Sequence, residues 1–126
     1  MDEYHGIVIN LSLKNPSIIN DLDVIGKRSV ILNLLVLYKL RVLPENIDVV
    51  IRRLQANMRD GLLWLIPGFY FHFYRDNELI IVFKNKIFRA TPDPTTWSEA
   101  LTYGWSLGIS GKQLDFFPCR FSDETY

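Results

Sequence analysis

Residues 68–89 read GFYFHFYRDNELIIVFKNKIFR, and this stretch decides the fold. Its alternation predicts a strand with phenylalanines on one face and polar aromatic residues on the other. The first face holds Phe69, Phe71 and Phe73, and the second holds Tyr70, His72 and Tyr74. A strand with aromatic side chains on both faces needs cover on both, either inside the fold or against a binding partner.

Two turn signals divide this stretch into a three-stranded meander over residues 69–90. The first is Asp76-Asn77 and the second is Lys84-Asn85-Lys86. A two-residue first turn sets the register of the hairpin. The expected pairs are Arg75 with Glu78, Tyr74 with Leu79, His72 with Ile81 and Tyr70 with Phe83. We expect Arg75 and Glu78 to bracket the turn as an ion pair.

Two further strands are expected upstream, near residues 4–13 and 30–42. The first shows clean alternation of apolar and polar positions. The run 29–43 fits a period of two and also partly suits a helix, and its β-branched and aromatic residues favour one long strand. Between them, Asn15-Pro16-Ser17 is a helix-start signal, which predicts a short helix over 18–25 that Gly26 ends.

Two longer helices are expected near residues 45–59 and 97–107. The first follows from an apolar stripe at helical spacing, made of Ile47, Val50, Ile51, Leu54 and Met58. The second begins at Thr96, because the Thr-x-x-Glu spacing to Glu99 is that of a capping box, and Gly108 is placed to end it.

This order of elements predicts an α+β fold for a single globular domain over residues 1–126. A mainly antiparallel sheet, with the helices on one face, suits the pattern. A ferredoxin-like arrangement is a special case, because strand-helix-strand-strand-helix-strand fits the chain from Ser29 to Phe117.

Composition narrows the classes of function. The chain has 14 basic and 14 acidic residues, so no overall field attracts a polyanion, and a nucleic-acid partner is not favoured. One cysteine, Cys119, excludes an intrachain disulfide, and the N-terminus lacks the basic region of a signal peptide. The longest apolar run is too short to cross a bilayer. We therefore expect a cytoplasmic protein with no membrane partner.

Catalytic signatures give no support to an enzyme. The sequence contains no phosphate-binding glycine loop, no zinc-protease motif and no CxxC pair. Residues 104–108, GWSLG, match the letters of a nucleophile elbow, but the predicted helix precedes the serine where a strand is required. We expect no catalytic residue and no cofactor.

Three titratable residues still deserve a chemical interpretation. His72 lies between two tyrosines on a strand face. This position suits a catalytic acid or base, and it also suits a histidine that only forms a structural hydrogen bond. His5 would approach His72 if the first strand lies beside the meander, and Asp2, Glu3 or Asp115 would then complete a metal site. The spacing of these residues in the sequence is not that of a known metal motif, so we expect no bound metal. Cys119 is interpreted as a small core residue.

These observations leave three hypotheses of function. The leading one is non-catalytic binding or self-association through the aromatic strand face, with a homodimer as partner. The alternative is a small-molecule binder or enzyme, with Trp97 and Trp105 walling a pocket floored by Tyr70, His72 and Tyr74. The second alternative is single-stranded nucleic-acid binding on a platform of Trp64, Tyr70, Tyr74 and Phe83, rimmed by Lys84, Lys86 and Arg89.

Overall fold

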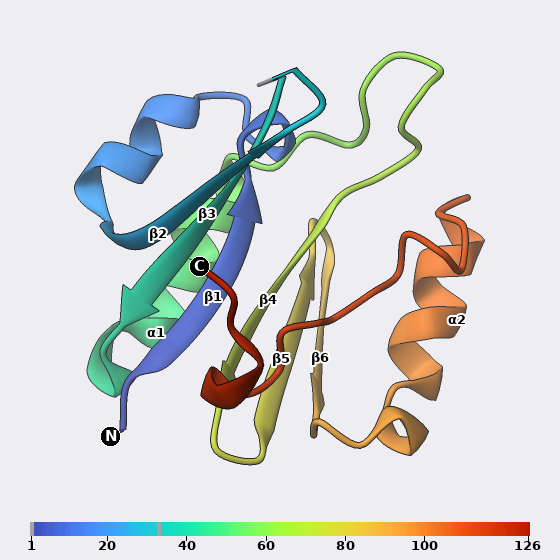
Figure 1. Cartoon of the computed structure of the whole chain (residues 1–126). Coiled ribbons are helices and arrows are strands. Elements are labelled where there is room, and N and C mark those ends of the chain that lie inside the picture. Colours follow the sequence, from blue (N-terminus) through green and yellow to red (C-terminus); the bar gives the residue numbers. More distant parts are fainter. Residues whose placement is uncertain (1, 33) are drawn as a thin grey trace.

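The computed structural model describes residues 2–32 and 34–126. These residues form a six-stranded sheet in the order β2-β3-β1-β4-β5-β6, in which every neighbouring pair is antiparallel (Figure 1). The strands are β1 Tyr4–Ile9, β2 Asp23–Val30, β3 Leu35–Val42, β4 Tyr70–Arg75, β5 Glu78–Phe83 and β6 Lys86–Ala90. The two α-helices are α1 Ile47–Ala56 and α2 Ser98–Ser106. The predicted α+β class is confirmed.

The meander has the predicted strands and the predicted register. Tyr70 pairs with Phe83, His72 with Ile81 and Tyr74 with Leu79 across β4 and β5. Asp76 adopts a left-handed φ of 45° in the two-residue turn. The Arg75 guanidinium lies 3.3 Å from the Glu78 carboxylate, so the expected ion pair brackets this turn.

The chain between residues 16 and 42 differs from expectation. A 3₁₀ helix spans Pro16–Asp21, with Asn15 as its N-cap, and β2 begins at Asp23 where the short helix was predicted to continue. Gly26 lies inside β2 beside a register shift. The single long strand over 29–43 is a hairpin whose tip lies between β2 and β3. Apart from Asn33, apolar residues run from Val30 at the end of β2 to Tyr38 in β3, so local pattern does not locate the turn.

The centre of the sheet is a split βαβ unit. The parallel strands β3 and β4 are connected through α1, and β1 is inserted between them as an antiparallel neighbour of both. The ferredoxin-like special case does not fit, because β6 precedes α2 and no strand follows α2 in the part of the chain that the structure describes.

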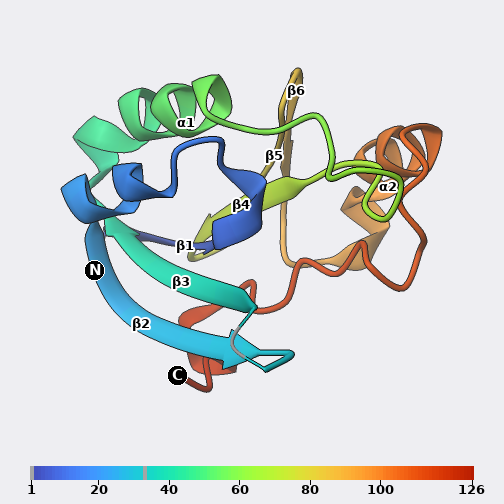
Figure 2. The ribbon, with the colours of Figure 1, turned by 90° about the horizontal axis from the view of Figure 1, so that it is seen from above.

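The two helices cover opposite faces of the sheet, whereas the sequence predicted one face (Figure 2). The stripe of α1 packs with Phe69, Phe71 and Phe73 in one core cluster. Helix α2 packs with Tyr74, Ile81 and Phe83 in the other. Side chains of successive strand residues point to opposite faces, so the two aromatic rows of β4 each have their own cover.

The start of α2 is built without a capping box. Thr96 lies in a 3₁₀ turn, Pro94–Thr96, and its hydroxyl donates to the Asp93 carbonyl at 2.7 Å. The N-cap of α2 is Trp97, and no side chain caps this end. Gly108 ends the helix with a left-handed φ of 96°, as predicted.

Candidate functional site

The polar aromatic row of β4 is covered by the chain's own C-terminal segment, residues 109–126. This segment crosses the face of the sheet beside α2 (Figure 1). The Tyr70 hydroxyl donates to the Gln113 carbonyl at 2.5 Å and accepts the backbone N–H of Asp115 at 3.0 Å. Burial raises the pKa of Tyr70 to about 12, so the phenol keeps its proton at neutral pH.

His72 contacts the same segment further along. Its Nε2 lies 2.8 Å from the Pro118 carbonyl oxygen, and the residue is only 4% exposed. A carbonyl can only accept, so Nε2 carries the proton. Burial lowers the pKa of His72 to about 4, which leaves the imidazole neutral at pH 7. Its Nδ1 is then the acceptor nitrogen of the ring.

Tyr74 meets the end of the segment. Its hydroxyl donates to Glu124 Oε2 at 2.5 Å, and His5 Nδ1 lies 2.5 Å from the same oxygen. Lys39 Nζ lies 3.4 Å from the other carboxylate oxygen. Burial and the carboxylate together raise the pKa of the Tyr74 phenol. Glu124 therefore binds the segment to side chains of β1, β3 and β4.

A pocket of about 310 Å³ lies between the sheet and the C-terminal segment. Its lining is mainly aliphatic and aromatic, and four polar side chains reach it. The apolar side chains come from Ile7, Ile9, Leu35, Leu37, Ile66, Phe69, Ile109 and Phe117. The polar ones are Tyr70, His72, Gln113 and Asp115. Ligand sites in proteins commonly combine such an apolar lining with a few polar groups.

A second cavity of about 220 Å³ adjoins this pocket. The two share Ile7, Leu37, Asp115 and Phe117, and the second continues past Lys39 to Tyr126. A larger depression of about 470 Å³ lies between β6 and α2. That depression is a shallow surface feature whose charged side chains, Lys86 and Glu99, are exposed, so the 310 Å³ pocket is the better candidate site.

The structure brings together only part of the predicted site. Tyr70 and His72 line the pocket, whereas Tyr74 is fully buried against Glu124. Trp97 donates its indole N–H to the Thr91 carbonyl and packs against Phe116, and Trp105 is exposed on α2. Neither tryptophan lines the pocket.

The missed residues come from β1, from β3, from the chain just before β4 and from the segment after α2. Leu35 and Leu37 carried an alternation signal, but the sheet order that places β3 near β4 is a long-range property. Ile109, Gln113 and Phe117 belong to a stretch without regular secondary structure. No periodic pattern predicts where such a stretch packs.

The other residues considered for chemistry, Ser106, Cys119 and His5, make contacts that stabilise the fold. Ser106 is the last residue of α2, and its hydroxyl donates to the Tyr103 carbonyl, which is not the geometry of a nucleophile elbow. Burial and the nearby Asp123 raise the pKa of the Cys119 thiol. His5 stacks on Phe121 with ring centroids 3.9 Å apart. Across residues 2–32 and 34–126, no group of histidine, cysteine and carboxylate side chains is arranged to hold a metal.

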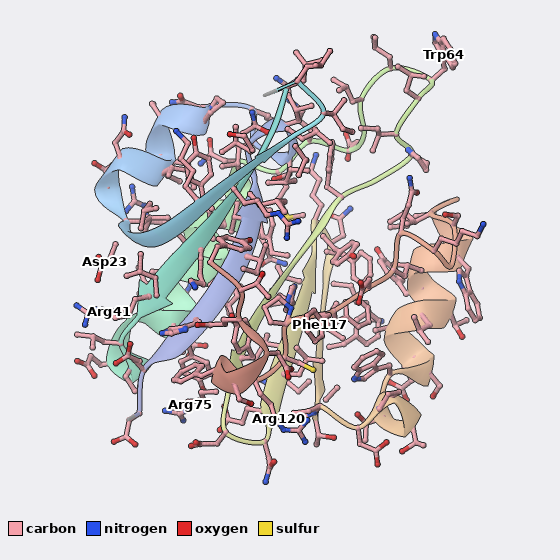
Figure 3. The ribbon with its side chains drawn as sticks, in the orientation of Figure 1. Asp23, Arg41, Trp64, Arg75, Phe117 and Arg120 are labelled. Atoms are coloured by element: carbon pink, nitrogen blue, oxygen red, sulfur yellow. The ribbon has the colours of Figure 1, made fainter. Side chains whose placement is uncertain are left out.

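The proposed stacking platform is not assembled on one exposed face. Tyr74 and Phe83 are fully buried, and Trp64 lies on a loop tip away from them (Figure 3). The self-association expected from the aromatic strand face stays a prediction. Because the C-terminal segment already covers that face, a surface for self-association would have to lie elsewhere on the molecule.

Comparisons of the chain with protein-family models, curated proteins and solved structures found no match. Among the helices of the described residues, none has the length and apolarity needed to span a membrane. The geometry of the pocket is therefore the basis on which a function can be inferred.

Proposed function

We propose that this protein is a non-catalytic binding protein whose 310 Å³ pocket takes a small, mainly apolar molecule. The observation that carries the proposal is the position of the buried His72 in the lining of a mainly apolar pocket. The volume corresponds to the lower end of typical ligand sites. An apolar ligand gains free energy from leaving water, and one polar contact orients it.

The protonation state of His72 supports binding of a hydrogen-bond donor. Its Nε2 donates to the Pro118 carbonyl, so Nδ1 is the atom that remains to accept a hydrogen bond from a ligand O–H or N–H. The hydroxyl of Tyr70 is already engaged with residues 113 and 115. A ligand with one donor group and an apolar body therefore matches the lining.

The same features favour binding over catalysis. A general base works best with a pKa near the working pH, and the pKa of His72 lies well below that range. The pKa of Tyr70 lies well above it. Both side chains are also held by backbone hydrogen bonds, which suits a rigid wall better than proton transfer.

The test is equilibrium binding of the fluorescent probe 1-anilinonaphthalene-8-sulfonate, followed by competition with small apolar alcohols and phenols. Leu37→Trp fills the pocket and should weaken probe binding by roughly tenfold or more. Val49→Trp, on the exposed side of α1, is the matched control and should leave the affinity unchanged. Equal affinities for the two variants would contradict the proposal, as would failure of every alcohol and phenol to displace the probe.

A further inference from the structure

Two loop tips expose bulky apolar side chains to solvent. One tip, with residues 31, 32 and 34, lies between β2 and β3, and the other, residues 63–65, lies between α1 and β4. Leu32 is 93% exposed, Trp64 is 87% exposed and Leu63 is 83% exposed. Ile31, Leu34 and Leu65 are also more than half exposed. We call these residues the two apolar tips.

Both tips project from the same end of the molecule. Both lie at the top of Figure 1, and Figure 2, which looks down on that end, shows them on different sides of it. Figure 3 shows Trp64 at the far point of its loop. Each tip leads into the pocket lining along the chain, because the lining residues Leu35 and Ile66 directly follow Leu34 and Leu65.

The backbone holds these side chains outward at a cost. Ile31, Leu32 and Leu63 have φ values of 52°, 54° and 53°. The left-handed region disfavours bulky side chains by about 1–3 kcal/mol each. Bulky apolar side chains held in solvent on a strained backbone are typical of a surface that meets another apolar phase or partner.

Charge is divided between the two ends of this neutral chain. The connections at the end of the apolar tips, residues 10–15, 31–34, 57–69, 84–85 and 107–113, contain four basic residues and one acidic residue. They are Lys14, Arg59, Lys84 and Lys112, with Asp60 paired to Lys84, and Lys86 follows as the first residue of β6. Connections at the opposite end, residues 2–3, 43–46, 76–77 and 91–97, hold five acids and no basic residue, and Arg75 beside the 76–77 turn is paired with Glu78.

We propose that the two apolar tips dock this protein on an anionic lipid surface. Leucine, isoleucine and tryptophan side chains enter the boundary between headgroups and acyl chains, and tryptophan favours that depth. The surrounding lysines and arginine contact anionic headgroups. The acidic end then points away from the membrane. The expectation of no membrane partner came from the lack of a spanning segment, whereas this docking is peripheral and needs none.

The charge pattern favours lipid over a second copy of the chain as the occupant. A symmetric dimer through the tips would bring two basic ends face to face, because a two-fold interface uses the same patch on both subunits. Like charges directly opposed destabilise an interface. An anionic surface satisfies the same residues without that repulsion.

The test is cosedimentation of the whole protein with phosphatidylcholine vesicles, with and without phosphatidylserine. We expect binding that needs phosphatidylserine and weakens with salt. The double variant Leu32→Ser/Trp64→Ser should lose at least roughly tenfold in partitioning. Leu43→Ser/Val49→Ser removes two exposed apolar side chains elsewhere and should bind like the unchanged protein.

A charge-matched pair tests the basic rim. Lys112→Glu should weaken partitioning by roughly tenfold, whereas Arg120→Glu, which changes the net charge by the same amount, should have little effect. A blue shift of tryptophan emission on vesicles should disappear in Trp64→Leu. The pocket variant Leu37→Trp should dock normally, so failure of ligand binding and failure of docking are separable.

Two results would overturn docking on lipid. The first is no cosedimentation of the unchanged protein at low salt. The second is a dimer in light scattering that Leu32→Ser/Trp64→Ser converts to a monomer while vesicle binding is absent, which would assign the tips to a second copy.

Discussion

The hydroxyl of Tyr74 and the carboxylate of Glu124 lie 2.5 Å apart, although 50 residues separate them in the chain. Tyr74 is fully buried, and the Glu124 side chain is mostly covered. This pair attaches the end of the C-terminal segment to the sheet. Since the same segment forms one wall of the pocket, its attachment also maintains the site.

Removing either partner should loosen the segment. Tyr74→Phe and Glu124→Gln should each lower the free energy of unfolding by about 1–3 kcal/mol, because a hydrogen bond to a charged group is lost. The double variant should cost less than the sum, with a coupling of about 1 kcal/mol or more. Urea unfolding of the four proteins measures this cycle. Strict additivity would show that the two side chains do not act together.

Acid should release the same attachment. Burial alone would raise the pKa of Glu124, but hydrogen bonds from Tyr74 and His5 outweigh it and leave the pKa below its usual value. The contribution to stability is therefore present above the ordinary carboxyl pKa and is lost as pH falls through the lowered one. Hydrogen exchange of residues 119–126 should accelerate at that point. In Glu124→Gln the exchange should be fast already at neutral pH and should lack this step.

His72 should make folding sensitive to mild acid. Its pKa falls from 6.5 to about 4 on folding, so the unfolded chain binds a proton first as pH drops. Stability should decline by about 2 kcal/mol between about pH 7.5 and about pH 5, and this decline should level off below about pH 4. His72→Gln should lack this part of the slope in urea unfolding. An equal slope in both proteins would assign the effect to other groups.

Adding even one methyl group at Gly6 should destabilise the fold. Gly6 pairs with Phe73, and a Cβ at Gly6 would lie 2.3 Å from Phe73 Cδ1. Gly6→Ala should therefore cost about 1–3 kcal/mol of stability by overpacking. Gly111→Ala, whose Cβ would meet nothing closer than 3.5 Å, is the control. Introduced together with Phe73→Leu, the alanine should cost less than it does alone, and an undiminished cost would exclude the ring clash as its cause.

Local pattern was sufficient for the meander and for the positions of both helices. The alternation of β4, the turn at Asp76-Asn77 and the stripe of α1 depend on residues close together in the chain. Their register follows from adjacent residues, so the Arg75 and Glu78 pair was predictable. The failures lie where two local readings compete. Residues 16–30 carry both a helix-start signal and β-branched residues, and only the pairing of β2 with β3 decides between them.

The sequence by itself determined that β4 has a phenylalanine face and a polar aromatic face, because side chains of a strand alternate. It could not say what covers each face. Tertiary structure placed α1 on the first face through apolar packing. It placed the C-terminal segment on the second face through hydrogen bonds between residues 43 to 50 positions apart. Such contacts depend on how much apolar surface the whole domain buries and how much conformational entropy it loses on folding. A short stretch of sequence does not determine either quantity. The pocket and the shared direction of the two apolar tips arise only at that level.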